Sequence, residues 1–239
     1  MEGKSGIVVT GANGLLGTTL RKIRPDIHYV DIEDFDITDY EQMKGYFEPD
    51  GFDLMIHCAA FTSPPLIDKE PLKAVEVNII GTCNVVKLCM EYDARLIYIC
   101  TDYVFRGDKG NYKEDDPVYP VNKYAWSKLG GECAARLYDK SLIIRTTFGP
   151  DVFPYEKAFV DQWTSRESVS TIAMKISKLI GKNITGVIHV GGPRRTVFEF
   201  AKSLDETKDI KELSVGDVDF VVPVDTSLNC DRYKEIIKD

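Results

Sequence analysis

The fold of this chain of 239 residues is decided by Ile7-Val8-Val9-Thr10-Gly11-Ala12-Asn13-Gly14-Leu15-Leu16-Gly17. A short apolar run over residues 7–10 predicts a strand, and helix-forming residues follow from Thr18 to Ile23. The glycines between them have a G-x-x-G-x-x-G spacing, which lets backbone approach a pyrophosphate while a helix N-terminus faces its charge. A tight strand-to-helix turn without a ligand is the alternative. We expect a dinucleotide to contact Gly11, Asn13, Gly14, Leu15, Leu16 and Gly17.

A carboxylate ends the next predicted strand, over residues 28–31. Asp31 lies 31 − 11 = 20 residues past Gly11. An acidic side chain at this distance accepts hydrogen bonds from adenosine ribose hydroxyls and repels a 2′-phosphate. Of the two nicotinamide cofactors, NAD(H) and NADP(H), the sequence therefore slightly favours NAD(H).

Two residues of the following acidic cluster, Asp36 and Ile37, are expected to reach the adenine. Capping of the next helix by Thr38 or Asp39 is the alternative, and it would explain the cluster without any ligand.

A third strand is predicted over residues 52–58, and small residues follow it. We expect the cofactor to pass close to the chain here, at Cys58, Ala59, Ala60 and Thr62. A long helix is predicted from about residue 72 to residue 92, with the polar Asn78 among apolar neighbours. A buried asparagine needs partners, so Asn78 either ties the helix to a neighbouring loop or contributes to the cofactor site.

A fourth strand, over residues 95–100, delivers the hydroxyl of Thr101, and a later helix begins near Tyr124. Tyr124 and Lys128 are four residues apart and therefore share one helix face. An ammonium beside a phenol would make the phenol a usable proton donor near neutral pH. An ordinary pair on a helix surface is the alternative.

With a fifth strand over residues 141–145, the alternation of strands and helices predicts a doubly wound parallel sheet of the Rossmann type. We expect residues 1–150, with a returning strand at 186–190, to form the cofactor domain. Residues 151–239 are expected to form mainly a small, shortened substrate-binding lobe. Arg194 and Arg195 are candidate contacts to a substrate phosphate, with a solvated basic turn as the alternative.

Composition excludes several other classes of protein. The formal net charge of −8 argues against a nucleic-acid or anionic-membrane partner. The six cysteines form no C-x-x-C pair and the three histidines are isolated, so neither a disulfide framework nor a metal site is expected. No apolar run is long enough for a spanning helix, and we expect a cytoplasmic protein. A homodimer is among the assemblies that the sequence allows.

Several motifs together resemble the extended short-chain dehydrogenase/reductase superfamily and, within it, the dTDP-4-dehydrorhamnose reductases and related nucleotide-sugar 4-keto reductases. The resemblance covers most of residues 6–150 and resumes more weakly as far as residue 229. Its motifs are Thr10 to Gly17, Asp36-Ile37-Thr38, Cys58-Ala59-Ala60-Phe61-Thr62, Thr101-Asp102-Tyr103-Val104-Phe105 and Tyr124-x-x-x-Lys128.

The resemblance implies an oxidoreductase that reduces the 4-keto group of a nucleotide-linked 4-keto-6-deoxyhexose, as in rhamnose biosynthesis, with a nicotinamide cofactor and no metal. It implies that Tyr124 protonates the carbonyl oxygen. Lys128 would hold the nicotinamide ribose and lower the pKa of the phenol, and Thr101 would orient the substrate. Further substrate contacts are expected at Thr62, Asp102, Tyr103 and Phe148.

The chain departs from the family pattern at three places. Pro64-Pro65 stands where members usually carry Val-Asp, Cys100 replaces a common serine, and residues 150–161 form a shorter segment than usual. These departures leave the nucleotide and the sugar open. A nucleotide-sugar epimerase or dehydratase on the same fold, and a non-catalytic cofactor-binding regulatory subunit, are the alternative functions.

Overall fold

A six-stranded parallel sheet forms the centre of the protein, in a computed structural model that describes residues 6–238. The strand order is β10-β5-β4-β3-β1-β2, so the chain winds outward from β1 in both directions. All neighbouring pairs in this sheet are parallel, and the predicted Rossmann-type sheet is confirmed. The strands are β1 (Ile7–Thr10), β2 (His28–Val30), β3 (Leu54–His57), β4 (Arg95–Thr101), β5 (Ser141–Thr146) and β10 (Gly186–Val190).

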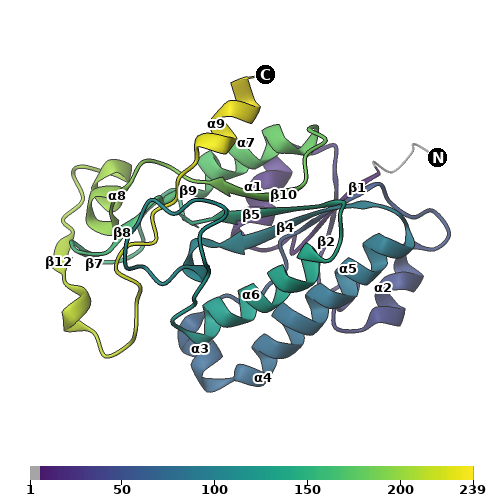
Figure 1. Ribbon diagram of the computed structural model, residues 1–239, viewed down its shortest axis with the longest axis horizontal. Helices are drawn as coiled ribbons and strands as arrows, with labels where there is room; N and C mark the ends of the chain where they lie inside the picture. Colours follow the sequence, from purple (N-terminus) through teal and green to yellow (C-terminus); the bar gives the residue numbers. More distant parts are fainter. Residues whose placement is uncertain (1–5, 239) are drawn as a thin grey trace.

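Helices cover both faces of this sheet, which is why β3 and β5 are buried at every position (Figure 1). On one face, α1 (Leu15–Ile23) and α7 (Val169–Ile180) pack into a single apolar cluster with the strands. On the other face lie α2 (Tyr40–Phe47), α5 (Thr82–Glu91) and α6 (Lys123–Arg136). The glycine turn and the end of β4 are thereby held at one edge of a rigid, closed core.

The long helix expected over residues 72–92 consists of three consecutive helical parts. After α3 (Pro64–Lys69), α4 (Pro71–Ala74) leads into a π-helical stretch, η1 (Val75–Gly81), and α5 continues from there. Wider π-helical turns often occur at functional sites. Asn78 lies inside this stretch, which brings it beside the loop that follows β3.

A small lobe lies beside the carboxyl ends of the strands (Figure 1), with an apolar core of its own that includes Phe153, Phe200 and Ile210. By contrast, α7, β10 and α9 (Asp231–Lys238) return to the sheet. The division of the chain at residue 150 stays a prediction. The short elements outside the sheet are η2 (Asp102–Val104), β6 (Phe148–Gly149), β7 (Lys157–Phe159), β8 (Trp163–Thr164), β9 (Glu167–Ser168), β11 (Arg195–Thr196), α8 (Val197–Leu204), β12 (Lys211–Leu213) and η3 (Val215–Asp217).

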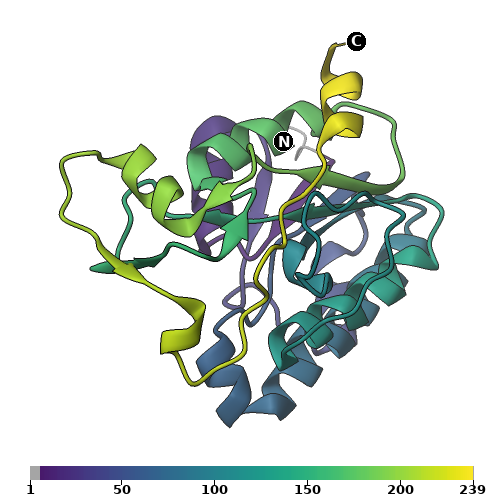
Figure 2. The same ribbon diagram turned by 60° about the vertical axis from the view of Figure 1, so that its left-hand side comes forward.

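The segment between η3 and α9 crosses from the lobe back to the sheet (Figure 2). On its way it pairs with the loop that follows η2. The amide of Tyr112 donates to the carbonyl of Ser227 at 2.9 Å, and the amide of Asn229 donates to the carbonyl of Tyr112 at 2.7 Å. This crossing segment therefore connects the lobe to the region directly after β4.

A fully buried ion pair fixes α6 to β5. The Nη2 and Nε groups of Arg145 donate to the two carboxylate oxygens of Glu132 at 2.7 and 3.1 Å. Both side chains are 0% exposed. Because α6 also carries Tyr124 and Lys128, this pair fixes the helix that holds the expected proton donor.

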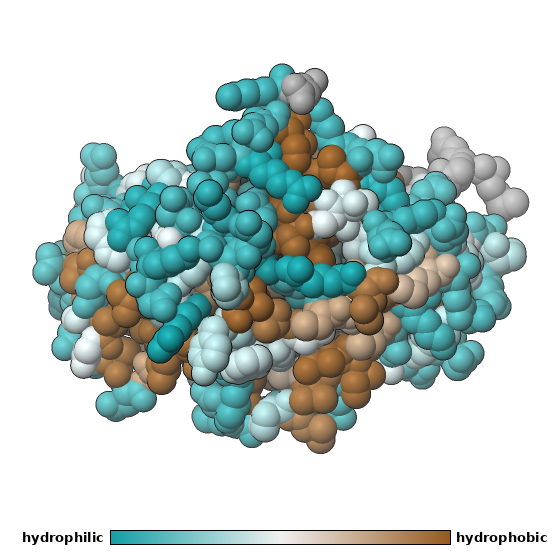
Figure 3. Space-filling model, in the orientation of Figure 1, coloured by the Kyte–Doolittle hydropathy of each residue, from teal (hydrophilic) through white to brown (hydrophobic). Residues whose placement is uncertain are grey.

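One face of the molecule carries a band of apolar surface along its lower edge, in the region of α4 and α6 (Figure 3). Exposed apolar side chains of these helices and of η1 include Leu72, Val75, Ile80 and Trp126. Such a surface is compatible with a homodimer, which stays a prediction. Among residues 6–238, no helix has the length and apolarity that crossing a membrane requires.

We expect Arg145→Met to lower the free energy of unfolding by about 3 kcal/mol, because the buried Glu132 carboxylate keeps only the half-exposed Arg136 as an ionic partner. The double variant Arg145→Met/Glu132→Gln should recover at least half of the loss. Urea unfolding followed by circular dichroism measures both. Equal losses in the single and double variants would contradict this account of the pair.

Candidate active site

The glycine turn brings two backbone segments into close contact. Gly11 has φ +72°, and a Cβ added there would lie 2.6 Å from the amide nitrogen of Ala59. A Cβ on Gly17 would lie 2.3 Å from the carbonyl oxygen of Gly11. At the start of α1, Gly14 is the N-cap and no side chain caps the helix. This narrow, uncapped cradle fits the pyrophosphate of a dinucleotide.

Carboxylates line one end of the cleft that begins at this turn. Asp31 accepts hydrogen bonds from the amides of Asn13 and Ile32 at 2.6 and 2.8 Å. Glu33 accepts a bond from the side chain of Asn13 at 3.2 Å. Glu33 was not among the residues predicted from the sequence, although it is an acid that lies two residues past Asp31. The cavity here is also lined by Asp36, as expected for the adenosine end.

A second cavity continues from the first, with which it shares Gly11, Gly14, Cys58 and Ala60. The cleft therefore runs along the carboxyl ends of the strands, where α/β sheets of this type bind ligands. All of the predicted site residues line these two joined cavities, with three exceptions. The exceptions are Asn78, Arg194 and Arg195.

Thr101 and Tyr124 lie close together in the wall of the cleft. Burial raises the pKa of the Tyr124 phenol, and the neighbouring Thr101 hydroxyl opposes the rise. The expectation that Lys128 lowers this pKa stays a prediction, and Thr101 is the neighbour that opposes the rise most. The Lys128 ammonium instead lies over the ring of Tyr98, 4.5 Å from its centroid, and burial lowers the pKa of Lys128.

Asp102, the next residue after Thr101, is a buried acid in the wall of the cleft. Its carboxylate accepts hydrogen bonds from the hydroxyl of Thr226 at 2.6 Å and from Thr101 at 3.2 Å. Burial raises the pKa of Asp102 to about 6, although Thr226, the charge of Arg166 and Thr101 oppose the rise. The acid thus joins the end of β4 to the crossing segment.

Asn78 is tied to a loop and does not line the cleft. Its side chain accepts from the amide of Phe61 at 2.7 Å and donates to the carbonyl of the same residue at 2.8 Å. A further bond of 2.8 Å reaches the hydroxyl of Ser127. Of the two alternatives for Asn78, the structure supports the loop connection, because its side-chain amide forms hydrogen bonds with that loop and with α6.

Arg194 and Arg195 have internal partners and lie outside the described cavities. Arg194 pairs with Asp225 at 2.8 Å, with its guanidinium 3.8 Å from the ring centroid of Trp163. Arg195 pairs with Glu167 at 2.9 Å. The expectation of direct phosphate contacts is not supported, because both guanidinium groups are already engaged within the lobe.

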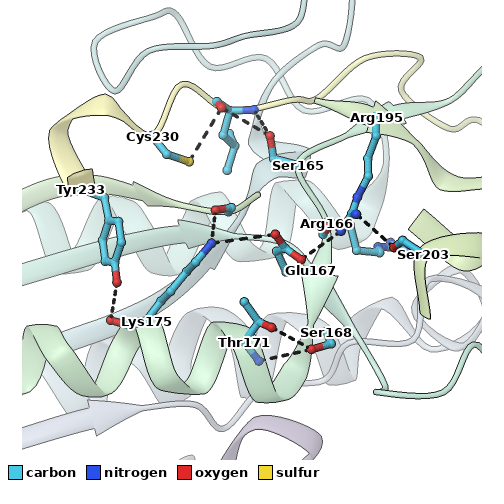
Figure 4. Close-up of polar contacts among 12 residues, drawn as sticks. Ser165, Arg166, Glu167, Ser168, Thr171, Lys175, Arg195, Ser203, Cys230 and Tyr233 are labelled. Carbon is cyan, nitrogen blue, oxygen red and sulfur yellow. Dashed lines mark hydrogen bonds and ion pairs between the residues drawn. The ribbon is translucent and has the colours of Figure 1, made fainter. Parts of the chain in front are cut away.

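Arg166 is the arginine that lines the cleft, and sequence reasoning missed it. Its Nε is buried without a hydrogen-bond partner among residues 6–238. Figure 4 shows how its backbone is held, because Arg195 donates to the carbonyl of Arg166 at 2.9 Å while pairing with Glu167. The only sequence signal was an arginine just before the Ser168 N-cap of α7.

A third and larger cavity opens between α3, the start of α6 and the lobe. It shares Pro64, Tyr103 and Arg166 with the cleft. Its walls are largely apolar and include Phe153, Tyr155, Phe159, Val197, Leu213, Phe220 and Val221. A ligand that extends from Tyr124 past Arg166 would enter this cavity.

The sheet, the glycine cradle and the neighbouring Tyr124 and Lys128 define a Rossmann-type dinucleotide-binding protein. The chain belongs to the RmlD substrate binding domain family, which it matches over residues 5–173. It is similar to a crystal structure of dTDP-4-dehydrorhamnose reductase from Bacillus anthracis in complex with NADP. The TM-score is 0.86 and the identity 28%, over 99% of this chain and 93% of that chain.

Two curated relatives differ in the protein that their names describe, since one is a reductase and the other a subunit of a methionine adenosyltransferase. A dTDP-4-dehydrorhamnose reductase of Aggregatibacter actinomycetemcomitans is 30% identical over 179 residues, 71% of this chain. This match spans only 61% of the relative's own length. The methionine adenosyltransferase 2 subunit beta of Pongo abelii is 27% identical over 237 residues, 82% of this chain and 70% of the relative.

The raised pKa of Asp102 predicts a pH-dependent effect of Asp102→Asn on stability. Because the folded protein binds this proton more tightly than the unfolded chain, the wild type loses stability as pH rises from about 4 to about 6. The variant lacks this loss. Its stability relative to the wild type should therefore increase by about 3 kcal/mol between pH 4 and pH 7.

Urea unfolding at a series of pH values measures this difference, with the exposed Asp50→Asn as the matched control. Parallel stability curves for Asp102→Asn and the wild type would contradict the prediction.

Proposed function

We propose that the protein uses NADH or NADPH to reduce the 4-keto group of a nucleotide-linked 4-keto-6-deoxyhexose, of the dTDP- or UDP-rhamnose type. The observation that carries the proposal is that Thr101, Tyr124 and Lys128 line the same cleft as the glycine cradle. The family of the chain and the similarity to a reductase that was solved with NADP support it.

When bound, the nicotinamide cofactor supplies the hydride. The residues of the chain must then deliver a proton to the oxygen of the ketone, where negative charge develops. We assign this proton to the phenol of Tyr124. Burial keeps the phenol protonated near neutral pH, and Thr101 lies beside it in the cleft. Lys128 would hold the ribose hydroxyls and stabilise the phenolate that remains.

The larger cavity is the proposed site for the nucleotide part of the substrate. Arg166 lies where this cavity meets the cleft, and its unpartnered Nε suits the diphosphate of a sugar nucleotide. The apolar and aromatic walls beyond it, including Tyr155 and Phe220, suit a base and its deoxyribose or ribose. The hydrogen bond that the Arg195 guanidinium donates to the Arg166 carbonyl would keep Arg166 in place.

NAD(H) is the cofactor that the adenosine end favours. The carboxylates of Asp31 and Glu33 both bond to Asn13 at the rim of the adenosine cavity. Two adjacent negative charges would repel the 2′-phosphate of NADP(H). The reductase from Bacillus anthracis was solved with NADP, so the proposed preference differs from the cofactor found in that structure.

A second candidate function is that of a non-catalytic, cofactor-binding regulatory subunit. The similarity to a protein named methionine adenosyltransferase 2 subunit beta favours it, because that match covers 82% of this chain. Both functions need the glycine cradle, but only a reductase needs the phenol of Tyr124. Cofactor binding without reduction of any ketone, together with stable association with an unrelated enzyme, would support the regulatory function.

We expect the protein to oxidise NADH in the presence of a dTDP- or UDP-linked 4-keto-6-deoxyhexose. Tyr124→Phe should reduce this turnover by roughly a hundredfold or more while leaving cofactor binding intact, because only the proton donor is lost. Absorbance at the NADH band measures the rate, and the exposed Tyr119→Phe is the matched control. Absence of turnover with every combination of nucleotide sugar and cofactor would refute the proposal.

The ratio of kcat/KM with NADH to kcat/KM with NADPH should exceed one and should fall about tenfold or more in Asp31→Ser, because a charge that repels the 2′-phosphate is removed. The exposed Asp50→Asn is the control and should leave the ratio unchanged. A wild type that prefers NADPH would contradict the assignment of Asp31.

A further inference from the structure

A row of buried polar side chains lies behind the cleft, from β1 across β3 and α5 to β4. Its members are Thr10, His57, Thr82 and Tyr98, each 1% exposed or less. Of the four, Thr10 alone lines a cavity described above. The others have no contact with the expected ligands, so polarity at these positions needs another explanation.

These side chains form a continuous series of polar contacts. The amide of Ala59 donates to Thr10 Oγ1 at 3.4 Å, and Thr10 Oγ1 lies 2.8 Å from His57 Nδ1. His57 Nε2 lies 3.1 Å from Thr82 Oγ1, and the hydroxyl of Thr82 lies beside that of Tyr98, whose pKa it lowers. Finally, the hydroxyl of Tyr98 donates to the carbonyl oxygen of Lys128 at 2.9 Å.

The chemistry of the two ends fixes the direction of every bond in the series. A carbonyl only accepts, so Tyr98 must donate to Lys128 and therefore accept from Thr82. Thr82 has then used its one proton and must accept from His57 Nε2. A neutral imidazole carries one ring proton, so His57 Nδ1 accepts from Thr10. Thr10 in turn accepts from the amide of Ala59, which only donates.

His57 must stay neutral for this series to exist, and its surroundings keep it so. Burial, together with the charge of Lys128, lowers the pKa of His57 to about 3. The ring is therefore neutral at physiological pH, and its neighbours select the tautomer with the proton on Nε2.

Tyr98 contacts Lys128 both at its main-chain carbonyl and at its side-chain ammonium. Its hydroxyl bonds to the main-chain carbonyl, and its ring lies under the ammonium, 4.5 Å from Nζ. Gly131 allows α6 to come this close, since a Cβ there would lie 2.6 Å from the Tyr98 hydroxyl and 3.1 Å from Thr82 Oγ1. One tyrosine thus sets both the backbone position and the direction of the lysine side chain.

We propose that Tyr98 is a positioning residue for Lys128, with Thr82, the Nε2-protonated form of His57 and Thr10 orienting its hydroxyl. The series connects Ala59, where the cofactor is expected to pass, to the helix that carries Tyr124 and Lys128. The proposal rests on the proposed function in one respect, which is that Lys128 binds the cofactor and assists Tyr124.

Tyr98→Phe keeps an aromatic ring at this position but removes the bond to the Lys128 carbonyl, which lets the Lys128 backbone and its ammonium shift away from Tyr124. We expect kcat to fall about tenfold. NADH should bind several-fold more weakly, and the alkaline limb of the kcat profile should move to higher pH, because the displaced cation stabilises the phenolate less. Thr82→Val should change the same quantities in the same direction, because it removes the bond that orients Tyr98.

Tyr138→Phe is the matched control. Its hydroxyl also donates to a main-chain carbonyl, that of Ala94 at 2.8 Å, but near the other end of α6. It should change thermal stability alone. Equal effects of Tyr98→Phe and Tyr138→Phe on kcat and on NADH affinity, measured by NADH fluorescence, would overturn the proposal.

The tautomer of His57 provides a test that needs no substrate. Nitrogen-15 spectra of the full-length protein should show the ring proton on Nε2 from pH 5 to pH 8, with His57→Gln used to assign the signals. In Thr82→Val the two tautomers should become mixed, since Nε2–H loses its acceptor. A wild-type ring protonated on Nδ1 would overturn the proposal.

Lys128→Met separates failure of this inference from failure of the proposed function. If Lys128→Met binds NADH and turns over like the wild type, the role of Lys128 is wrong and the positioning proposal falls with it. If Lys128→Met is impaired while Tyr98→Phe and Thr82→Val behave like the wild type, only the positioning proposal is overturned.

Discussion

The burial of the Lys128 ammonium is the constraint on which the rest of the site depends. A cation taken out of water is costly unless other groups compensate it. Burial lowers the pKa of Lys128, while Cys100, Cys58 and Glu132 raise it. Glu132 is itself held by Arg145, so charges of alternating sign lead from the cleft into the interior. The cation is thereby kept next to a phenol without being exposed to solvent.

This arrangement requires α6 to lie very close to the sheet, and the close approach explains several otherwise unrelated residues. Gly131 has no side chain where Tyr98 and Thr82 reach the helix. The Glu132 carboxylate lies four residues past Lys128, on the same face of α6, where it meets Arg145. The other wall of the cleft is built in the same way, because Gly11 and Gly17 allow backbone to touch backbone around the expected pyrophosphate. Packing distance, more than any single bond, therefore shapes both ends of the site.

Local patterns in the sequence were enough to predict the sheet, the glycine turn and the shared cleft of Thr101, Tyr124 and Lys128. These features depend on strand and helix periods and on the rule that parallel strands end at one edge. Arg166 could not be found in this way, because its place depends on how the lobe folds back. Arg194 and Arg195 were chosen as candidate phosphate contacts because they are an adjacent basic pair. They instead form ion pairs with Asp225 and Glu167, which are distant in sequence. The effect of Lys128 on the phenol stays a prediction, and the sequence gives no sign that Tyr98 lies under the ammonium.

The bond between Thr226 and Asp102 has a consequence for the order in which the protein is made. The two residues are 124 positions apart in the chain. At about 5–20 residues per second, a ribosome needs roughly 6–25 s to synthesise the chain between them. During that interval the sheet strands up to β5 can already pair, while the Asp102 carboxylate still lacks its partner from the crossing segment. The wall of the cleft is therefore among the last parts of the protein to form during translation.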